Sequence, residues 1–200
     1  MSQYFDSNPE VASKPRIVEF NIGDRKVSLY SDSGVFSKDN IDVGSLAFIK
    51  ALLPLKLSGN ILDLGCGYGP IGLSIALTSP DAYVTFADVN QRAVELCAKN
   101  AEKLGLGSRT KCLVSNVYEN IQGKFDTILL NPPIRAGKNV TYSMYLGALD
   151  HLCQNGSLYI VIRKAQGAPS AAKYIEGIFG NITLLKKDKG YYVYKATKTM

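Results

Sequence analysis

From residue 59 onward, short apolar segments alternate with longer amphipathic ones, and this alternation restricts the possible folds more than any other feature of the chain. The apolar segments are almost continuously hydrophobic, which indicates strands that are buried on both faces of a sheet. Helices between such strands cover both faces and make neighbouring strands parallel. The sequence therefore predicts an α/β, doubly wound, Rossmann-like, mostly parallel seven-stranded sheet. Five of its strands are expected at residues 60–65, 82–89, 111–117, 124–133 and 157–164.

The two ends of the chain complete this prediction. Residues 182–198 are expected to close the sheet as an antiparallel hairpin, and residues 17–31 to form a small N-terminal β-hairpin around the turn pair Gly23-Asp24. We expect residues 1–16, with their Ser, Pro and Asn, to be a mobile arm. The chain thus divides into residues 1–58, with the arm, the hairpin, a helix and a lid segment, and a larger domain of residues 59–200. Helices are expected at 45–55, 70–79, 91–107, 144–156 and 171–181, the fourth ending at Asn155-Gly156.

Composition excludes several classes of protein. The chain has 200 residues, of which 46% are hydrophobic, and this suits a globular protein with a proper core. No apolar run approaches the ~18 residues of a membrane helix, and the N-terminus lacks the apolar segment of a secretion signal. We therefore expect a cytoplasmic protein without membrane contact. The cysteines fit neither a zinc site nor a disulfide framework, so no metal is expected; they are Cys66, Cys97, Cys112 and Cys153.

The positive charge is concentrated at one end of the chain. Residues 160–200 hold eight Lys and Arg against two acidic residues, which accounts for the whole formal net charge of +6. A basic end on a neutral body is typical of proteins that bind a polyanion such as RNA. A solvated lysine-rich surface explains the same pattern equally well.

Glycines alternate in the segment Asp-Leu-Gly-Cys-Gly-Tyr-Gly, between an expected strand and an expected helix. Gly65, Gly67 and Gly69 permit positive φ and let a ligand lie directly against the backbone. Residues 67–72 also match the dinucleotide pattern G-x-G-x-x-G, but a single match of this kind is weak. Asp63 disfavours a pyrophosphate and suits a cationic group, such as the ammonium of a methionine moiety. The segment therefore favours S-adenosylmethionine over NAD.

Polar residues follow the next two expected strands. Asp88 stands about 20 residues beyond the glycines, where a carboxylate can accept hydrogen bonds from both ribose hydroxyls. After the third strand, the Asn116 amide could bind the adenine edge, while Val117 could pack on its face. Simple turn formation explains Asn116 almost as well. These positions fit a nucleoside ligand without separating the two cofactors.

The fourth expected strand runs directly into Asn131-Pro132-Pro133, which is the most specific chemical signal in the chain. Prolines remove backbone N–H donors, so this loop presents acceptors: the Asn131 side-chain oxygen and backbone carbonyls. Two acceptors can hold both hydrogens of an NH₂ group and direct its lone pair at a methyl donor. The motif therefore predicts methylation of an exocyclic or amide nitrogen.

Together these motifs resemble the class I S-adenosylmethionine-dependent methyltransferases, and more narrowly the small-subunit ribosomal RNA guanine-N2 methyltransferases. The resemblance rests on residues 34–45, 63–72, 86–90 and 131–134 and covers ~20 to ~197. It implies that residues 59–200 are a catalytic domain binding S-adenosyl-L-methionine, and that the partner is ribosomal RNA or the small ribosomal subunit. It assigns cofactor binding to Asp63, Gly65, Cys66, Gly67, Gly69, Asp88, Val89, Asn116, Val117 and Asn131, catalysis to Asn131, Pro132 and Pro133, and a lid to Phe36 and Asp42.

Two features depart from the family pattern. Ile134 stands where the family usually has an aromatic residue that stacks on a flat target. Well-known members also carry an additional N-terminal domain, whereas about 58 residues precede the core here. RNA binding is therefore expected from the core, the arm and the basic end. The basic residues expected to contact RNA are Arg135, Lys138, Arg163 and Lys164.

Other functions use the same motifs. Methylation of a protein glutamine needs the same Asn-Pro-Pro chemistry, and a small-molecule amine is a further possible substrate. A degenerate copy that binds RNA without turnover is the non-enzymatic alternative, although it would have no chemical need for Asp63, Asp88 and Asn131. We expect the single histidine, His151, to be structural. Tyr191, Tyr192 and Tyr194 are expected in a strand, where tyrosine is favoured, and stacking of Tyr191 or Tyr192 on a base is the weaker alternative.

Overall fold

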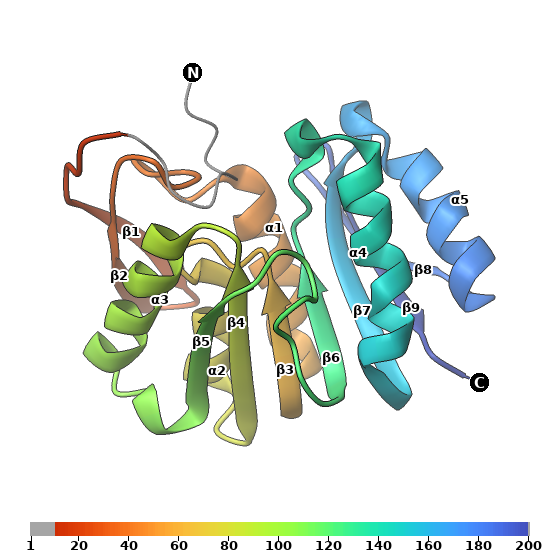
Figure 1. Ribbon diagram of the computed structural model, residues 1–200, viewed down its shortest axis with the longest axis horizontal. Helices are drawn as coiled ribbons and strands as arrows, with labels where there is room; N and C mark the ends of the chain where they lie inside the picture. Colours follow the sequence, from red (N-terminus) through yellow and green to blue (C-terminus); the bar gives the residue numbers. More distant parts are fainter. Residues whose placement is uncertain (1–10, 200) are drawn as a thin grey trace.

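The computed structural model describes residues 11–199, so that most of the expected mobile arm lies outside the described residues (Figure 1). A seven-stranded sheet forms the centre of the molecule. Its strands are β3 (Gly59–Leu64), β4 (Ala82–Asp88), β5 (Thr110–Val114), β6 (Phe125–Leu130), β7 (Leu152–Arg163), β8 (Thr183–Asp188) and β9 (Tyr191–Thr197).

The strands lie in the order β5-β4-β3-β6-β7-β9-β8. The strands from β5 to β7 are parallel, whereas β9 pairs antiparallel with β7, and β8 pairs antiparallel with β9. The β8–β9 turn has positive φ at both Lys189 and Gly190, as a two-residue hairpin turn requires. The predicted parallel sheet with an antiparallel C-terminal hairpin is therefore confirmed.

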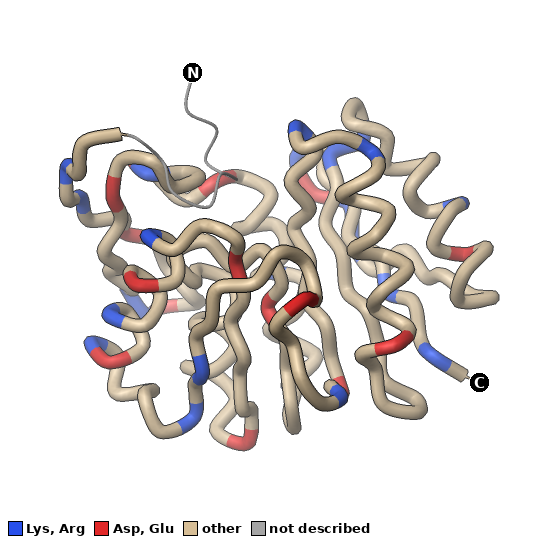
Figure 2. The backbone as a smooth tube through the Cα atoms, viewed as in Figure 1, with Lys and Arg blue, Asp and Glu red and all other residues tan. Residues whose placement is uncertain are grey.

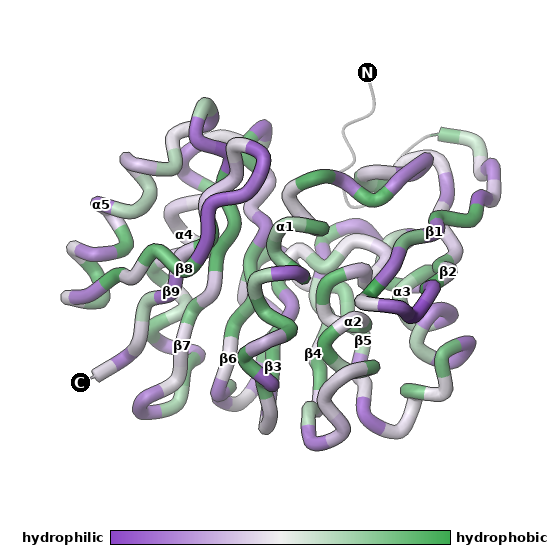
Figure 3. Tube along the Cα trace, turned by 180° about the vertical axis from the view of Figure 1, so that it is seen from behind, coloured by the Kyte–Doolittle hydropathy of each residue, from purple (hydrophilic) through white to green (hydrophobic). Residues whose placement is uncertain are grey.

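Helices cover both faces of the sheet, as the continuously apolar strands predict (Figures 1 and 3). A separate hairpin of β1 (Arg16–Ile22) and β2 (Arg25–Ser31) precedes them and packs against the third helix. No helix within residues 11–199 is long and apolar enough to cross a membrane. The helices are α1 (Val43–Leu52), α2 (Pro70–Thr78), α3 (Gln91–Lys103), α4 (Lys138–His151) and α5 (Ala168–Phe179).

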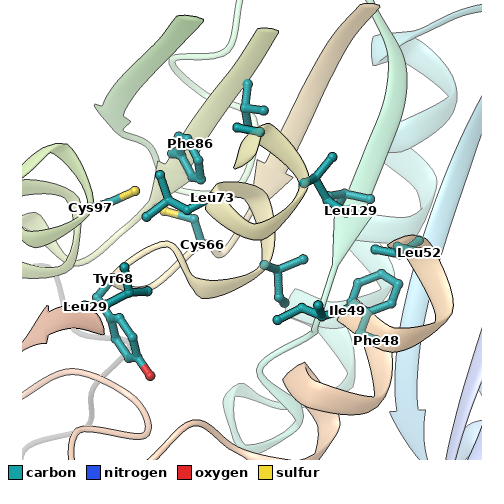
Figure 4. Close-up of a cluster of buried hydrophobic side chains, with 14 of the residues drawn as sticks. Leu29, Phe48, Ile49, Leu52, Cys66, Tyr68, Leu73, Phe86, Cys97 and Leu129 are labelled. Atoms are coloured by element: carbon teal, nitrogen blue, oxygen red, sulfur yellow. The ribbon is translucent and has the colours of Figure 1, made fainter. Parts of the chain in front are cut away.

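Successive strand residues point to opposite faces of the sheet and build two separate cores. Ile61 of β3 joins the core under α1, α2, α3 and the N-terminal hairpin, whereas its neighbour Leu62 joins the core under α4 and α5. Figure 4 shows the first core, where Leu73 of α2 lies between Phe86 of β4 and Cys97 of α3. This double burial fixes the strand register and hence the positions of the strand ends.

Helix starts lie at the edge of the sheet where the parallel strands end. Asp42 caps α1, accepting hydrogen bonds from the N–H groups of Gly44 (2.8 Å) and Ser45 (3.2 Å). Asn90 caps α3, and Pro70 occupies the first turn of α2, where its missing N–H removes no helical bond. The loops before these helices are therefore held in fixed positions.

The expected helix at residues 144–156 is wrong at both ends. It begins at Lys138 and ends at His151, and Asn155-Gly156 lies within β7. Asn155 has φ +63° and its N–H donates to the Lys198 carbonyl (2.9 Å). The register of β7 against β6 shifts at this place. The pair therefore forms an irregularity in a strand, since a turn signal alone does not distinguish a bulge from a helix stop.

Candidate active site

A cavity of about 700 Å³ opens at the carboxyl edge of the parallel strands, where the loops after β3, β4, β5 and β6 meet. The chain continues to opposite sides of β3 at this point, which is where doubly wound sheets bind ligands. The first turn of α1 and the adjacent ends of β7 and β9 complete the wall. Most predicted site residues line it: Phe36, Asp42, Gly65, Cys66, Gly67, Asp88, Val89, Asn116, Val117, Asn131, Pro132, Pro133, Arg135 and Arg163.

The glycine loop presents backbone to the cavity. Gly65 and Gly67 have φ of +72° and +57°, a conformation that side chains disfavour. A Cβ atom added to Gly67 would meet nothing within 4 Å, so the space in front of this residue is open to a ligand. Gly69 has another role, because an added Cβ would lie 2.6 Å from the Cys97 sulfur. Gly69 therefore permits close packing of the loop on α3 and does not line the cavity.

Asp88 connects the glycine loop with the next helix. One carboxylate oxygen accepts the Gly67 N–H (2.8 Å) and the other accepts the Asn90 N–H (2.9 Å). Burial raises the pKa of Asp88, and these hydrogen bonds oppose that shift. A backbone hydrogen bond from Val89 also lowers this pKa, and the carboxylate keeps acceptor capacity for a further donor. Asp88 therefore places a carboxylate acceptor at the cavity wall, and its contact with ribose hydroxyl groups stays a prediction.

Asp63 does not reach the cavity, which corrects the expected contact with a methionine ammonium. Its side chain points beneath the loop toward α2, where Oδ2 accepts the Gly72 N–H at 2.8 Å. The residue is 1% exposed, and desolvation raises its pKa to about 7. Strand alternation explains the error, because Asp63 faces the same core as Ile61. Asp63 therefore fixes the position of the loop on α2.

The loop after β5 supplies another wall of the cavity. Val117 lines it with φ +51°, which is unusual for a β-branched residue. Ser115 Oγ holds this turn, donating to the Val117 carbonyl (3.0 Å) and accepting the Asn120 N–H (3.1 Å). The Asn116 amide nitrogen donates to Glu119 (2.8 Å). An apolar surface beside a polar edge results, and a purine ring has the same combination of face and edge.

Asn131 is held by side chains from the first turn of α1. Its amide nitrogen donates to Ser45 Oγ at 3.1 Å, and the Ser45 hydroxyl donates in turn to Asp42. These two successive hydrogen bonds direct the amide nitrogen of Asn131 toward α1. Within residues 11–199, no donor hydrogen-bonds to the Asn131 side-chain oxygen. The pair Asp42–Ser45 therefore leaves that oxygen available to a ligand.

The segment before α1, which was predicted to be a lid, forms part of the cavity wall. Phe36 lines the cavity and is 43% exposed. Two hydrogen bonds tie the segment down: the Tyr68 hydroxyl donates to the Ser37 carbonyl (3.4 Å), and the Asn90 amide donates to the Gly34 carbonyl (2.8 Å). The segment is therefore attached to the glycine loop and to the start of α3.

The four basic residues expected to bind RNA gather near the cavity mouth but do not share one role. Arg135 and Arg163 line the cavity, whereas Lys138 and Lys164 lie outside its wall. Figure 2 shows Lys and Arg grouped near the start of α4. In the described part of the chain, none of the four has an acidic partner, since the ion pairs there involve other basic residues. This side of the cavity is therefore positively charged.

Sequence reasoning missed several residues of the cavity wall. Ser45 is at the end of a segment that carried the family resemblance, so a hydroxyl near Asn131 could have been suspected. Met144 gave no signal, because it comes from a helix face. Tyr191 was expected in a strand, with base stacking as the weaker alternative, and its place in the cavity wall follows from the antiparallel pairing of β9 with β7. His151 is structural as expected, stacking on Tyr118 with ring centroids 4.2 Å apart. Among the described residues, no cluster of His, Cys, Asp or Glu could hold a metal ion.

Comparison with known proteins agrees with this geometry. Residues 26–195 match the family model of the methyltransferase small domain. The chain is 43% identical over 197 residues to the uncharacterized protein YbxB of Bacillus subtilis, covering 98% of both chains. It is also 34% identical over 168 residues to ribosomal RNA small subunit methyltransferase C of Serratia proteamaculans, covering 82% of this chain and 47% of that protein. The chain thus spans about half of the length of this rRNA enzyme.

Solved structures show the same relationship. The T. thermophilus 16S rRNA N2 methyltransferase RsmC, in complex with AdoMet and guanosine, superposes with a TM-score of 0.82 at 27% identity. The match covers 95% of this chain and 52% of that one. A methyltransferase of Pyrococcus furiosus superposes with a TM-score of 0.68 at 19% identity over 78% of this chain and 83% of that one, which shows a shared fold alone.

Proposed function

The chain belongs to the methyltransferase small domain family, and from this premise we propose that it methylates the exocyclic N2 amine of a guanine in small-subunit ribosomal RNA. The cofactor is S-adenosylmethionine, since the cavity offers an open glycine loop, a carboxylate and an apolar wall in the order that this molecule needs. The single observation that carries the amine target is the side chain of Asn131, whose oxygen is left as an acceptor at the cavity wall.

Asn131 and the prolines after it would position the amino group. The Asn131 oxygen accepts one N–H of the amine, and the Pro132 carbonyl, which already accepts the Ile134 N–H at 2.9 Å, has a second lone pair for the other. Because the loop is already fixed, it loses little conformational entropy when the amine binds. Ser45 and Asp42 prevent the amide from turning its nitrogen toward the substrate, where two donors would repel each other.

Bound S-adenosylmethionine supplies an electrophilic methyl group on a positively charged sulfur. Holding both N–H bonds would direct the nitrogen lone pair at that methyl carbon. Transfer would then form the N–C bond as the C–S bond breaks with its electrons left on sulfur. The nitrogen then carries a positive charge, which the Asn131 oxygen and the Pro132 carbonyl stabilise. One proton leaves to water. No strong base is needed, because the amine loses its proton as the charge develops.

Two further observations support RNA as the substrate class. The relatives from Serratia proteamaculans and Salmonella choleraesuis are both named as small-subunit rRNA methyltransferases. Arg135 and Arg163 line the cavity mouth without an acidic partner among the described residues, where they would neutralise phosphate groups. A guanine must leave its base stack to reach a recessed methyl group, so an unpaired or flipped nucleotide is expected.

Transfer of a labelled methyl group tests the substrate class. The protein is incubated with tritiated-methyl S-adenosylmethionine and either small ribosomal subunits or deproteinised RNA from a strain that lacks the gene. We expect label in RNA, with Asn131→Ala as the inactive control. Label in a protein glutamine instead would support the alternative methyltransferase, and cofactor binding without transfer to either substrate would support a degenerate RNA-binding copy. Comparing subunits with free RNA also shows which of the two is the substrate.

A further inference from the structure

Tyr191 reaches the active-site edge although it begins its strand. β9 runs antiparallel to β7, so its first residue lies beside Arg163, the last residue of β7. The parallel strands end at this same edge, and Tyr191 consequently lines the cavity together with Asn131. The antiparallel hairpin thus adds an aromatic side chain to a site built mainly from the loops after the parallel strands and the start of α1.

The first turn of α1 brings Tyr191 and Asn131 to one wall. A Cβ atom added to Gly44 would lie 2.7 Å from Cε1 of the Tyr191 ring, so the ring packs directly on this glycine. The next residue, Ser45, accepts the hydrogen bond from the Asn131 amide at 3.1 Å. Two consecutive residues therefore contact the aromatic ring and the acceptor group. The ring is only partly buried, which leaves part of its surface to the cavity.

On the Asn-Pro-Pro side, the described residues that form the cavity wall include no aromatic side chain. Ile134 follows the prolines and lines the same cavity. An aliphatic side chain can pack on a base, but an aromatic ring offers the flat π-face on which bases stack with substantial affinity. Arg135 and Arg163 flank the opening. A flat ring, an acceptor and flanking cations are the components of a site for an extruded nucleotide.

We propose that Tyr191 is the stacking surface for the target base, supplying the aromatic contact that Ile134 does not. The proposal rests on the proposed function, because it requires that a base be presented to Asn131. Gly44 supports the ring from behind, so that little conformational freedom is lost when a base stacks on it. Tyr191 acts as a specificity and positioning residue, since a flat ring selects bases over the extended side chain of a protein glutamine.

Binding of guanosine tests this directly. The wild-type protein, saturated with S-adenosylhomocysteine, is titrated with guanosine by calorimetry, alongside Tyr191→Ala and Tyr191→Phe. We expect Tyr191→Ala to bind guanosine roughly 10- to 100-fold more weakly, and Tyr191→Phe to remain within about twofold of the wild type, because it keeps the ring. Tyr192→Ala is the matched control. That side chain belongs to the opposite core and lies under Lys187, and its loss should leave guanosine binding unchanged.

The outcomes separate this proposal from the proposed function. Equal guanosine binding by the wild type and Tyr191→Ala would overturn the stacking role, as would an absence of binding by the wild type or a Tyr191→Phe protein as weak as Tyr191→Ala. Guanosine binding that depends on the ring, combined with no methyl transfer to RNA, would retain Tyr191 and remove the proposed function. Affinity for S-adenosylhomocysteine should stay the same in every variant, which excludes a general loss of structure.

Discussion

The two halves of the cavity are built differently. The half that faces the glycine loop consists of backbone and of groups fixed by backbone hydrogen bonds, such as Asp88 with the N–H groups of Gly67 and Asn90. The half around Asn131 consists of side chains from α1, the loop after β6, β7 and β9, where Tyr191 is partly buried and Arg163 is exposed. A shared cofactor needs the first kind of site, whereas a substrate that differs between family members needs the second.

This difference has an energetic consequence. Backbone groups held by a strand and a helix cap are preorganised, so a change there alters affinity for the ligand or the stability of the fold. In the proposed function, side chains such as Asn131 would act on the substrate in the transition state, so their loss should alter the rate. The two halves should therefore respond to mutation in different measured quantities.

Asn131→Ala should have the largest effect. An unchanged rate of methyl transfer in this variant would contradict the difference between the two halves of the cavity. We expect kcat for methyl transfer to fall by about 10²- to 10³-fold, the usual effect of removing one well-placed electrostatic group. The dissociation constant of S-adenosylhomocysteine should change by no more than about threefold. Ser45→Ala, which removes only the group that orients the amide, should lower kcat by about tenfold. Single-turnover assays with small subunits measure the rate of methyl transfer for both variants. A wild-type rate in Asn131→Ala would refute the acceptor role.

Asp88→Asn should produce the complementary result in the other half. The amide keeps the size of the carboxylate but loses its charge and one acceptor, and two charge-assisted hydrogen bonds to ribose hydroxyls would weaken. We expect cofactor affinity to fall by about 100-fold, on the order of 3 kcal/mol. The rate at saturating cofactor should remain near that of the wild type. Calorimetric titration measures the affinity, and an unchanged dissociation constant would contradict the assignment of Asp88.

Gly72→Ala should destabilise the fold beneath the glycine loop. An added Cβ would lie 2.5 Å from Phe86 Cε1 and 2.8 Å from Asp63 Oδ2, in a region with no free space. Overpacking of this kind should lower the free energy of unfolding by about 1–3 kcal/mol. Gly177→Ala is the matched control on the exposed side of α5, where an added Cβ meets nothing within 4 Å. Gly177→Ala should stabilise the protein by about 0.5–1 kcal/mol in urea unfolding. Equal effects of the two substitutions on the free energy of unfolding would contradict the close packing of Gly72 on Phe86 and Asp63.

Asp63→Asn should give the smallest change, seen mainly in pH dependence. Because the pKa of Asp63 in the folded protein is raised from its ordinary value near 4 to about 7, the folded state keeps a proton that the unfolded chain has lost between these values. The free energy of unfolding should therefore fall as pH rises from ~4 to ~7, and Asp63→Asn should reduce that slope. Urea unfolding at several pH values measures it. An unchanged slope with a large loss of cofactor affinity would instead indicate a direct contact.

Much of the fold follows from local sequence. Double-sided burial made the parallel strands recognisable, and Pro70, Asn90 and the glycines marked the strand–helix junctions. The bounds of helix α4 could not be predicted in this way. An Asn-Gly pair such as Asn155-Gly156 is found both at the ends of helices and in irregularities of strands. Asp63 was correctly placed at a strand end, but its side-chain direction depended on the parity of the strand, which the motif does not reveal.

The target half of the site was far less accessible to sequence reasoning. Asn131 was recognisable because strand, asparagine and prolines are adjacent in the chain. Tyr191 and Ser45 contribute through packing between segments that are far apart in sequence. Their positions depend on the antiparallel pairing of β9 and on how α1 lies across the sheet. Such contacts appear only when the whole fold is assembled.

The position of the transferred methyl group tests the account most directly. RNA labelled by the enzyme is digested to nucleosides, and the labelled nucleoside is identified by chromatography and mass spectrometry. In the proposed function, acceptors at Asn131 and Pro132 would hold the N2 amine of a guanine, so N2-methylguanosine is the expected product. A methyl group on a ring nitrogen, a ribose oxygen or a base carbon would contradict the central claim, because none of these atoms offers the two hydrogens that the acceptors require.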